Sequence, residues 1–291
     1  MVRKTSKKKE LPLEIKTFDI CKDDLNNIND IEDVDYILHM ASIASPSFYR
    51  KYPIETLDAN IWGLRRILDY YKEKKIKGLL MFSSSEVYGD PDSKNIPTKE
   101  NYFGNVSSIG PRACYDEAKR FSETLCYLFS QKYEMPISMV RPFNNFGPGM
   151  SLEDKRVPAD FAKAIKNAKD IKIFSDGTPT RTFCYISDAI VGYLKALTYK
   201  NFEIFNIGID SPEISIAELA KIYAQKGKLI FKYKGKVRIE NPPEKDYMTN
   251  NPNRRCPDIS LAKKILKFNP QIKVDVGIER FLSFLKNEVQ S

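Results

Sequence analysis

The residues best suited to chemistry in this chain are Tyr115 and Lys119, which lie four positions apart in the stretch CYDEAKR at 114–120. Side chains at positions i and i+4 of a helix lie on the same face. A lysine ammonium beside a phenol stabilises the phenolate and lowers the tyrosine pKa from about 10 toward neutrality. The spacing therefore predicts a tyrosine base, although the Y-x-x-x-K pattern alone also arises by chance on solvated helix faces.

Polar side chains elsewhere offer partners for such a base. In FSSSEVYGDP, at 82–91, an apolar run leads into three serines and Glu86. A hydroxyl at the carboxyl end of a parallel strand can hydrogen-bond a substrate oxygen while a tyrosine takes its proton, and a plain serine-rich turn is the alternative. Farther on, RPFNNFGPGM at 141–150 follows another apolar run, and GTPTRTFCYISDA at 177–189 carries Arg181 and Asp188. Together these segments indicate one site.

Alternating strands and helices would position these residues. Short apolar runs predict strands at 36–40, 78–83 and 137–141, and apolar–polar alternation predicts another at 11–18, ending at Asp19. Helical spacing covers 54–72 and 112–133. The alternation predicts a parallel sheet with helices on both faces and a site at the carboxyl ends of the strands.

A second lobe is expected after Gly149, where the elements become shorter. The pattern predicts helices near 157–167, 187–199, 215–224 and 275–286, and a strand near 204–207. A cleft between two lobes is the default place for a small-molecule site.

The composition limits the class of protein. The 291 residues, 42% of them apolar, suffice for one large α/β domain with a smaller one attached. No apolar run is long enough to span a membrane and the lysine-rich start lacks a secretory signal, so a cytoplasmic protein is expected. The five cysteines include no C-x-x-C pair and His39 is the only histidine, which argues against a Cys/His metal site. His39 is expected to be a packed core residue or to line a cofactor cleft.

The net charge of +9 permits an anionic partner without identifying one. Part of the excess lies in the basic residues at 3–9, and part at 226–238, where basic and apolar residues alternate. Such runs are usually solvated faces or tails, so nucleic-acid binding is the minor alternative and no nucleic-acid partner is expected.

Taken together, the motifs resemble those of the extended short-chain dehydrogenase/reductase superfamily, within it the NAD-dependent epimerase/dehydratase family, and most closely the UDP-glucuronate decarboxylases. The resemblance covers 16–284 and rests on SSSEVYGDP, GNVSSIGPRACYDEAKR, RPFNNFGPGM, TPTRTFCYISDA, FNIG and RRCPDIS, in this order. It implies a Rossmann-like, doubly wound parallel sheet in residues 1–150 that binds NAD. It also implies a smaller C-terminal lobe in 151–291 that mainly binds the nucleotide sugar, with elements near 181–190 returning to the first domain, and a homodimer.

The resemblance further implies a redox cycle on NAD. Tyr115 would deprotonate the sugar 4-hydroxyl as the C4 hydride leaves, Lys119 would hold the nicotinamide ribose, and Ser84 would hydrogen-bond the reacting oxygen. The resulting 4-ketone makes the C6 carboxylate a β-keto acid, which loses carbon dioxide before hydride return gives UDP-xylose. Arg181 would contact the substrate or donate a proton.

The resemblance also assigns roles residue by residue. Ser85 and Glu86 follow Ser84, as in the decarboxylases, whereas related 4,6-dehydratases carry Asp-Glu there. The implied catalytic residues are Ser84, Glu86, Tyr115, Lys119 and Arg181. The implied cofactor-binding residues are Asp19, Met40, Ala41, Ser42, Asn60, Tyr115 and Lys119, and the implied substrate-binding residues are Tyr49, Ser85, Asn144, Arg156 and Arg181. No metal is implied.

Departures from the family pattern leave alternatives open. The first glycine is Gly63, so the strand, glycine-rich turn and helix that normally hold the pyrophosphate are missing, and we expect an N-terminally incomplete sheet with weak NAD affinity. Asp58 replaces a lysine of the decarboxylases, and Gly149 replaces the arginine of their GPRM. The alternatives are a nucleotide-sugar 4-epimerase of the same family and a truncated, cofactor-deficient binding or regulatory protein.

Overall fold

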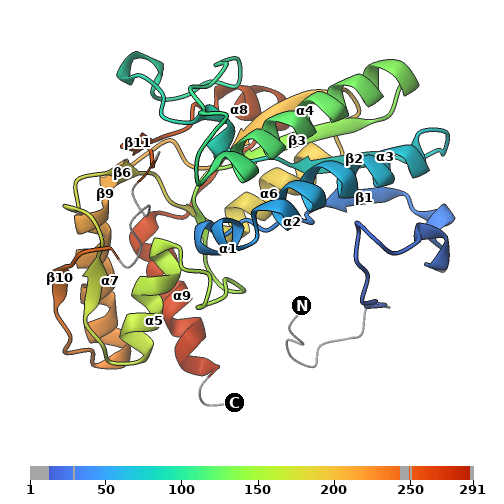
Figure 1. Cartoon of the computed structure of the whole chain (residues 1–291). Helices are drawn as coiled ribbons and strands as arrows, with labels where there is room; N and C mark the ends of the chain where they lie inside the picture. Colours follow the sequence, from blue (N-terminus) through green and yellow to red (C-terminus); the bar gives the residue numbers. More distant parts are fainter. Residues whose placement is uncertain (1–12, 29, 243–248, 250, 289–291) are drawn as a thin grey trace.

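A central sheet of four parallel strands organises the chain in the computed structural model, which describes residues 13–28, 30–242, 249 and 251–288. The strand order is β1–β2–β3–β8 (Figure 1). The strands are β1 (Tyr36–His39), β2 (Gly78–Phe82), β3 (Ile137–Pro142) and β8 (Glu203–Ile207). The predicted strands at 36–40, 78–83, 137–141 and 204–207 are confirmed, and so is the α/β fold class.

Helices cover both faces of this sheet because successive side chains of each strand point to opposite faces. Leu79 and Met81 of β2 belong to one apolar cluster with α3 (Leu64–Tyr71) and α4 (Ala113–Tyr133). Leu80, between them, belongs to another with α6 (Ile186–Leu197) and α8 (Ser260–Leu266). The sheet is therefore buried between two helical layers, and α4 confirms the helix predicted at 112–133.

A second lobe has its own core (Figure 1). α5 (Val157–Lys166), α7 (Ile216–Phe231) and α9 (Val274–Asn287) pack together with β5 (Ile171–Ile173), which pairs with β10 (Val237–Ile239). Phe161, Tyr223 and Ile278 are buried in this core. α6, β8 and α8 also follow residue 150 in the chain, but they belong to the layers of the central sheet.

Short elements complete the described chain. β4 (Asn145–Phe146) pairs with β7 (Cys184–Tyr185), and β6 (Thr180–Arg181) lies between β11 (Arg254–Arg255) and β9 (Ile214–Ser215). The other elements are α1 (Pro46–Lys51), α2 (Pro53–Asp58), the π-helical turn η3 (Ala59–Gly63) and the 3-10 turns η1 (Leu25–Asn27), η2 (Ile31–Asp33), η4 (Ser85–Tyr88) and η5 (Ser93–Asn95). The register of β11 with β6 places Arg255 beside Arg181.

The helix predicted at 54–72 is confirmed in extent, because helical backbone runs from Pro53 to Tyr71 through α2, η3 and α3. The π-helical turn within it was not predicted. Pro53 begins α2, at a position where its missing N–H costs no helical hydrogen bond. The side chain of Ser122, on α4, donates to the carbonyl of Asn60 at 3.0 Å, within the widened π-helical turn.

The strand predicted at 11–18 is also wrong for the part that the structure describes. Residues 13–18 have irregular backbone, and Leu13 and Ile15 are exposed. Within the described residues β1 pairs only with β2, so this segment has no neighbouring strand to pair with. Alternation of apolar and polar residues does not make a strand without such a partner. Residues 11–12 and the basic residues at 3–9 lie outside the described part.

α7 extends well beyond the helix predicted at 215–224. It continues through Gly227, where an added Cβ would lie 3.1 Å from atoms of α5.

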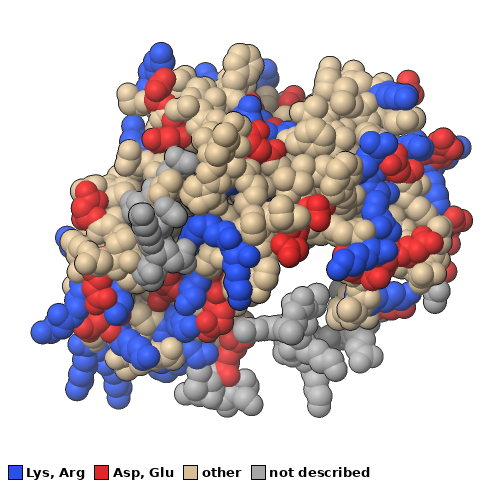
Figure 2. Space-filling view, viewed as in Figure 1, with Lys and Arg blue, Asp and Glu red and all other residues tan. Residues whose placement is uncertain are grey.

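In the basic stretch 226–238, Lys226 pairs with Glu279 at 2.6 Å and Arg238 pairs with Asp170 at 2.5 Å. Figure 2 shows basic and acidic side chains interspersed on the face in view. No helix in the described ranges has the length and apolar character needed to cross a membrane.

Candidate active site

Most of the predicted site residues line one cavity of about 970 Å³, at the carboxyl ends of β1, β2 and β3 and facing α5. The predicted residues that line it are Met40, Ser42, Tyr49, Ser84, Ser85, Glu86, Tyr115, Lys119, Asn144, Arg156 and Arg181. The carboxyl edge of a parallel sheet is where such sites were expected.

Tyr115 projects from the first turns of α4 and is buried, with 6% of its surface exposed. Its ring stacks on that of Tyr49, with centroids 5.1 Å apart, and the Ser84 side chain lies near its hydroxyl. The Lys119 ammonium lies 5.7 Å from the Tyr115 ring centroid and donates to the carbonyl of Phe82 at 2.7 Å. The tyrosine, the lysine and the serine thus line the same part of the cavity.

The electrostatics differ from the expectation of a phenol with a lowered pKa. Burial raises the pKa of Tyr115 to about 12, and the nearby Ser84 hydroxyl only partly offsets this. Burial likewise lowers the pKa of Lys119 to about 7, although the charges of Cys126 and Glu123 oppose the shift. In the ligand-free protein desolvation therefore outweighs the attraction between ammonium and phenolate.

Glu86 lies at the centre of a cluster of arginines. Its Oε2 accepts hydrogen bonds from Arg112 and, at 2.9 Å, from Arg255. Burial alone would raise the pKa of Glu86, but the charges of Arg255 and Arg112 outweigh burial and lower it. Burial raises the pKa of Asp116, which faces Arg112 at 3.5 Å, to about 7. Glu86 is therefore held ionised, which suits an electrostatic role better than proton donation.

Arg181 adds a further positive charge to this cluster. Its guanidinium donates to the backbone carbonyls of Thr180, Asn253 and Pro252 at 2.7, 3.0 and 2.5 Å. No described carboxylate lies within ion-pair distance of it. Burial, followed by the charge of Arg255, lowers the pKa of Arg181 to about 10. Three arginines face two carboxylates, Glu86 and Asp116, so the cluster keeps excess positive charge, which favours an anionic ligand.

The predicted substrate-binding residues lie around the same cavity. Asn144 has a positive φ of 43° and donates to the carbonyl of Thr182 at 3.0 Å. Arg156 forms a two-bond ion pair with Asp154, both contacts at 2.6 Å, directly before α5. Ser85 is buried, and its carbonyl accepts a hydrogen bond from Arg255.

Three predicted cofactor residues do not line this cavity. The carboxylate of Asp19 accepts from the backbone of Cys21 at 2.9 Å in an exposed turn. The Asn60 side chain is buried and donates to the carbonyl of Thr56 at 2.7 Å, so helical packing already occupies it. Ala41 is outside the lining although both of its neighbours belong to it.

Asp58 and Gly149, the two residues that differ from the decarboxylase pattern, also lie outside the cavity lining. Asp58 ends α2, and Gly149 is exposed with open space around its Cβ position. An acidic side chain at residue 58 therefore does not face a ligand in the cavity directly.

The polar lining fits a nucleotide-type ligand in part. Ser42 Oγ and Tyr49 OH are buried without a hydrogen-bond partner in the described chain, and both residues line the cavity. A ligand that carries hydroxyl, amide or phosphate groups would satisfy them. The residues after β1, at 40–45, include no glycine, so they do not form a glycine-rich phosphate cradle. The described residues contain no cluster of His, Cys, Asp and Glu able to hold a metal ion.

Arg112, Arg255 and Asp116 belong to the site but were missed from the sequence. Arg112 precedes Asp116 by four residues at the start of a helix, which is the spacing of an ion pair on one helical face. Arg255 lies inside the RRCPDIS motif, without any local feature that marks its contact with Glu86. Only the fold brings residue 255 to residue 86.

Comparison with known proteins identifies the family of this chain. The sequence model described as "NAD dependent epimerase/dehydratase family" matches residues 2–208. The chain is 36% identical over 246 residues to UDP-glucuronic acid decarboxylase 6 of Arabidopsis thaliana, covering 84% of this chain and 68% of that protein. It is 34% identical to UDP-glucuronic acid decarboxylase 1 of Xenopus tropicalis, covering 89% of this chain and 58% of that protein. The match thus spans only part of each relative.

Several solved structures have the same fold as this chain. UDP-glucuronic acid 4-epimerase of Bacillus cereus, in complex with NAD, has a TM-score of 0.75 at 25% identity, covering 94% of this chain and 79% of its own. UDP-glucose 4-epimerase of Thermotoga maritima, with UDP-glucose, has a TM-score of 0.76 at 22% identity, covering 88% of this chain and 78% of its own. Both likenesses agree with the predicted Rossmann-like architecture.

Proposed function

This chain belongs to the NAD dependent epimerase/dehydratase family, and we propose that it is an NAD-dependent decarboxylase that converts UDP-glucuronate into UDP-xylose. The observation that carries the proposal is the placement of Tyr115, Ser84 and Lys119 in one cavity, beside the arginines around Glu86. The first group suits proton abstraction from a sugar hydroxyl. The second suits a sugar that carries a carboxylate. The names of the curated relatives support this substrate.

The first step is oxidation at C4 of the sugar. Bound NAD would supply the hydride acceptor and later return the hydride. Tyr115, as the phenolate, takes the proton of the 4-hydroxyl while the C4–H electron pair leaves as hydride, so a ketone forms at C4. Ser84 donates a hydrogen bond to that oxygen, and protonated Lys119 stabilises the phenolate. Because burial raises the pKa of Tyr115 to about 12, the phenolate needs the positive charges of Lys119 and the bound cofactor.

The second step breaks the C5–C6 bond. Carbon dioxide leaves, and the electron pair of that bond becomes an enolate across C5, C4 and the C4 oxygen. Arg181 is a cation without a carboxylate partner in the described chain, so it can stabilise the carboxylate before this step and the enolate after it. Protonation at C5, hydride return to C4 and proton return from Tyr115 complete the pentose.

The division of ligands follows the two lobes. We propose that residues 1–150 hold the nicotinamide end of NAD through Met40, Ser42, Tyr115 and Lys119, and that residues 151–291, with Asn144, hold mainly the nucleotide sugar. Arg156, on the second-lobe side, is placed for a phosphate oxygen. Asp19, Ala41 and Asn60 have no part in this assignment, because they do not line the cavity.

The quaternary state and compartment are further proposals. α4 and α2 lie side by side and expose Ile54, Trp62, Phe121 and Leu128 on or beside them, a surface suited to a second copy of the chain. All five cysteines are free, which fits a reducing, cytoplasmic environment.

A 4-epimerase is the second candidate, because the same Tyr115, Lys119 and Ser84 would serve it and a solved 4-epimerase of UDP-glucuronic acid shares the fold. In that reaction the 4-ketone turns over in the site and receives hydride on its other face, so the carboxylate is retained. The excess of arginines suits both reactions, and only the product separates them. The cofactor-deficient alternative predicts neither product.

The test incubates the purified chain with NAD and UDP-glucuronate and identifies the nucleotide products by mass spectrometry. A decarboxylase gives UDP-pentose and carbon dioxide, whereas an epimerase gives UDP-galacturonate. UDP-glucose, which has no C6 carboxylate, is the matched control substrate and should not lose carbon. Formation of UDP-galacturonate alone would refute decarboxylation, and the absence of NAD binding and of any product would favour the cofactor-deficient alternative.

A further inference from the structure

We propose that Glu123 is a positioning residue, which holds the end of β2 and its Ser84 in register with Tyr115 and Lys119 on α4. The proposal rests on the function proposed above. It goes beyond that function because Glu123 does not line the cavity and so acts through its neighbours.

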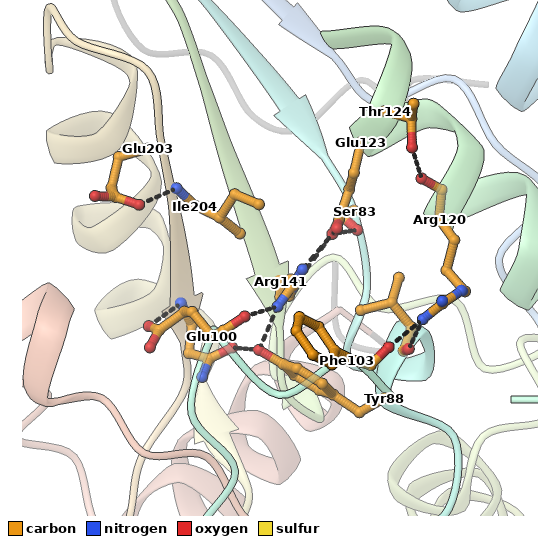
Figure 3. A network of polar contacts seen from close by, with 12 residues as sticks. Ser83, Tyr88, Glu100, Phe103, Arg120, Glu123, Thr124, Arg141, Glu203 and Ile204 are labelled. Atoms are coloured by element: carbon orange, nitrogen blue, oxygen red, sulfur yellow. Dashed lines mark hydrogen bonds and ion pairs between the residues drawn. The ribbon is translucent and has the colours of Figure 1, made fainter. Parts of the chain in front are cut away.

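The carboxylate of Glu123 joins α4 to two strands (Figure 3). Its Oε1 accepts from Ser83 Oγ at 2.5 Å and from Arg141 Nε at 2.7 Å. Its Oε2 accepts from Arg141 Nη2 at 2.6 Å. Ser83 follows β2 and directly precedes Ser84, while Arg141 belongs to β3. A shift of Glu123 would therefore move the residue next to Ser84.

The spacing along α4 brings this contact close to the proposed base. Tyr115, Lys119 and Glu123 follow one another at intervals of four residues, so they lie on one helical face. Lys119 is bound to the carbonyl of Phe82 and Glu123 to the side chain of Ser83. Two consecutive residues before Ser84 are thus tied to the helix that carries Tyr115.

Arg141 holds the Glu123 carboxylate in place and is itself held by further hydrogen bonds (Figure 3). Its Nη1 donates to Tyr88 OH at 2.7 Å and to the carbonyl of Glu100 at 2.8 Å, and Tyr88 OH donates in turn to Asn206 at 2.7 Å. Arg141 is buried, with 7% of its surface exposed. A buried ion pair with satisfied hydrogen bonds is a geometrically specific contact, so Glu123 has little freedom to move.

The test compares Ser83→Ala with Glu123→Gln and uses Glu117→Gln, a half-exposed glutamate of the same helix, as the matched control. Ser83→Ala keeps the ion pair with Arg141 and should fold normally, with kcat reduced about tenfold and KM little changed, because only the alignment is loosened. Turnover by Ser83→Ala equal to that of the parent would overturn the positional part. Crystals of ligand-free Ser83→Ala should also show the Ser84 side chain displaced relative to Tyr115, and an unchanged arrangement would count equally against the proposal.

Glu123→Gln should lower kcat at least as far as Ser83→Ala, because it weakens the contacts with both Ser83 and Arg141. Glu117→Gln should behave like the parent, and a folded Glu123→Gln with full turnover would overturn the proposal. If Glu123→Gln does not fold, Ser83→Ala decides the proposal. A parent without turnover would refute the proposed function alone, since the crystal readout remains.

Discussion

Tyr115 sits in a pocket that opposes its ionisation, and this decides how its removal should act. Tyr115→Phe keeps the stacking on Tyr49 and removes only the hydroxyl. We expect turnover to fall by roughly 100- to 10,000-fold, because proton transfer is lost, while the dissociation constant of UDP-glucuronate changes little. Steady-state kinetics and calorimetry measure the two quantities. Tyr127→Phe, an exposed tyrosine of the same helix, should behave like the parent. Full turnover of Tyr115→Phe would refute its role as the base.

Arg181 is expected to act after the ketone has formed. Its guanidinium is held by backbone carbonyls and has no described carboxylate partner, so its charge is available to the sugar carboxylate. We expect Arg181→Ala to slow release of carbon dioxide about 100-fold and to affect C4 oxidation much less, so that NADH accumulates. Absorbance at 340 nm reports C4 oxidation, and its rate is compared with the rate of carbon dioxide release. Arg238→Ala, at an exposed ion pair, is the control. An equal loss of both steps would mean that Arg181 only binds the substrate.

Buried His39 should make the free energy of unfolding fall as the pH falls. Burial, followed by the charge of Lys119, lowers the pKa of His39 from 6.5 to about 3. Below pH 6.5 the unfolded chain binds a proton that the folded chain does not, so this stability is complete above pH 6.5 and is lost as the pH falls toward 3. Between pH 7 and pH 5 the loss is about 2 kcal/mol. Urea unfolding should show that His39→Gln loses about 2 kcal/mol less than the parent over this range, and parallel profiles would contradict the argument.

At the scale of elements, α4 has one face in the site and another exposed. Phe121 and Leu128 are half-exposed on it, and Trp62 is exposed on the neighbouring η3. Figure 1 shows α4 and α2 side by side at the front, and Figure 2 shows this part of the same view as largely uncharged. If a second copy covers this surface, Leu128→Glu should convert a dimer into a monomer in light scattering, because it places a charge in an apolar interface. Leu229→Glu, an exposed leucine of α7, should leave the mass unchanged. A monomeric parent would refute the proposed homodimer.

The elements also show what local sequence determines. The buried strands β2 and β3 and the long helix α4 were predictable because each is a continuous apolar run or a clear helical stripe. The π-helical turn η3 between α2 and α3 was not, because it coincides with a tertiary hydrogen bond from Ser122. The segment at 13–18 has the alternation of a strand but no neighbour in the described structure. Pairing depends on a partner strand, which local pattern cannot supply.

At the scale of the whole molecule, the active site depends on residues far apart in sequence. The motifs predicted Tyr115, Lys119 and Ser84 correctly as neighbours, because their strand and helix are adjacent in the fold. They did not predict that Arg255 would help to hold Glu86 ionised, because that contact forms only when the β6–β11 pair reaches η4. Long-range electrostatics therefore had to be read from the structure.

The most direct test of the central claim is to follow the fate of C6. UDP-glucuronate labelled with 13C at C6 is incubated with the chain and NAD, and the reaction is monitored by 13C NMR. Decarboxylation predicts that the carboxylate signal is replaced by carbon dioxide and bicarbonate while unlabelled UDP-xylose forms in equal amount. If the label instead stays in a nucleotide-bound uronic acid of inverted C4 configuration, the chain is an epimerase and the assignment of decarboxylation is wrong.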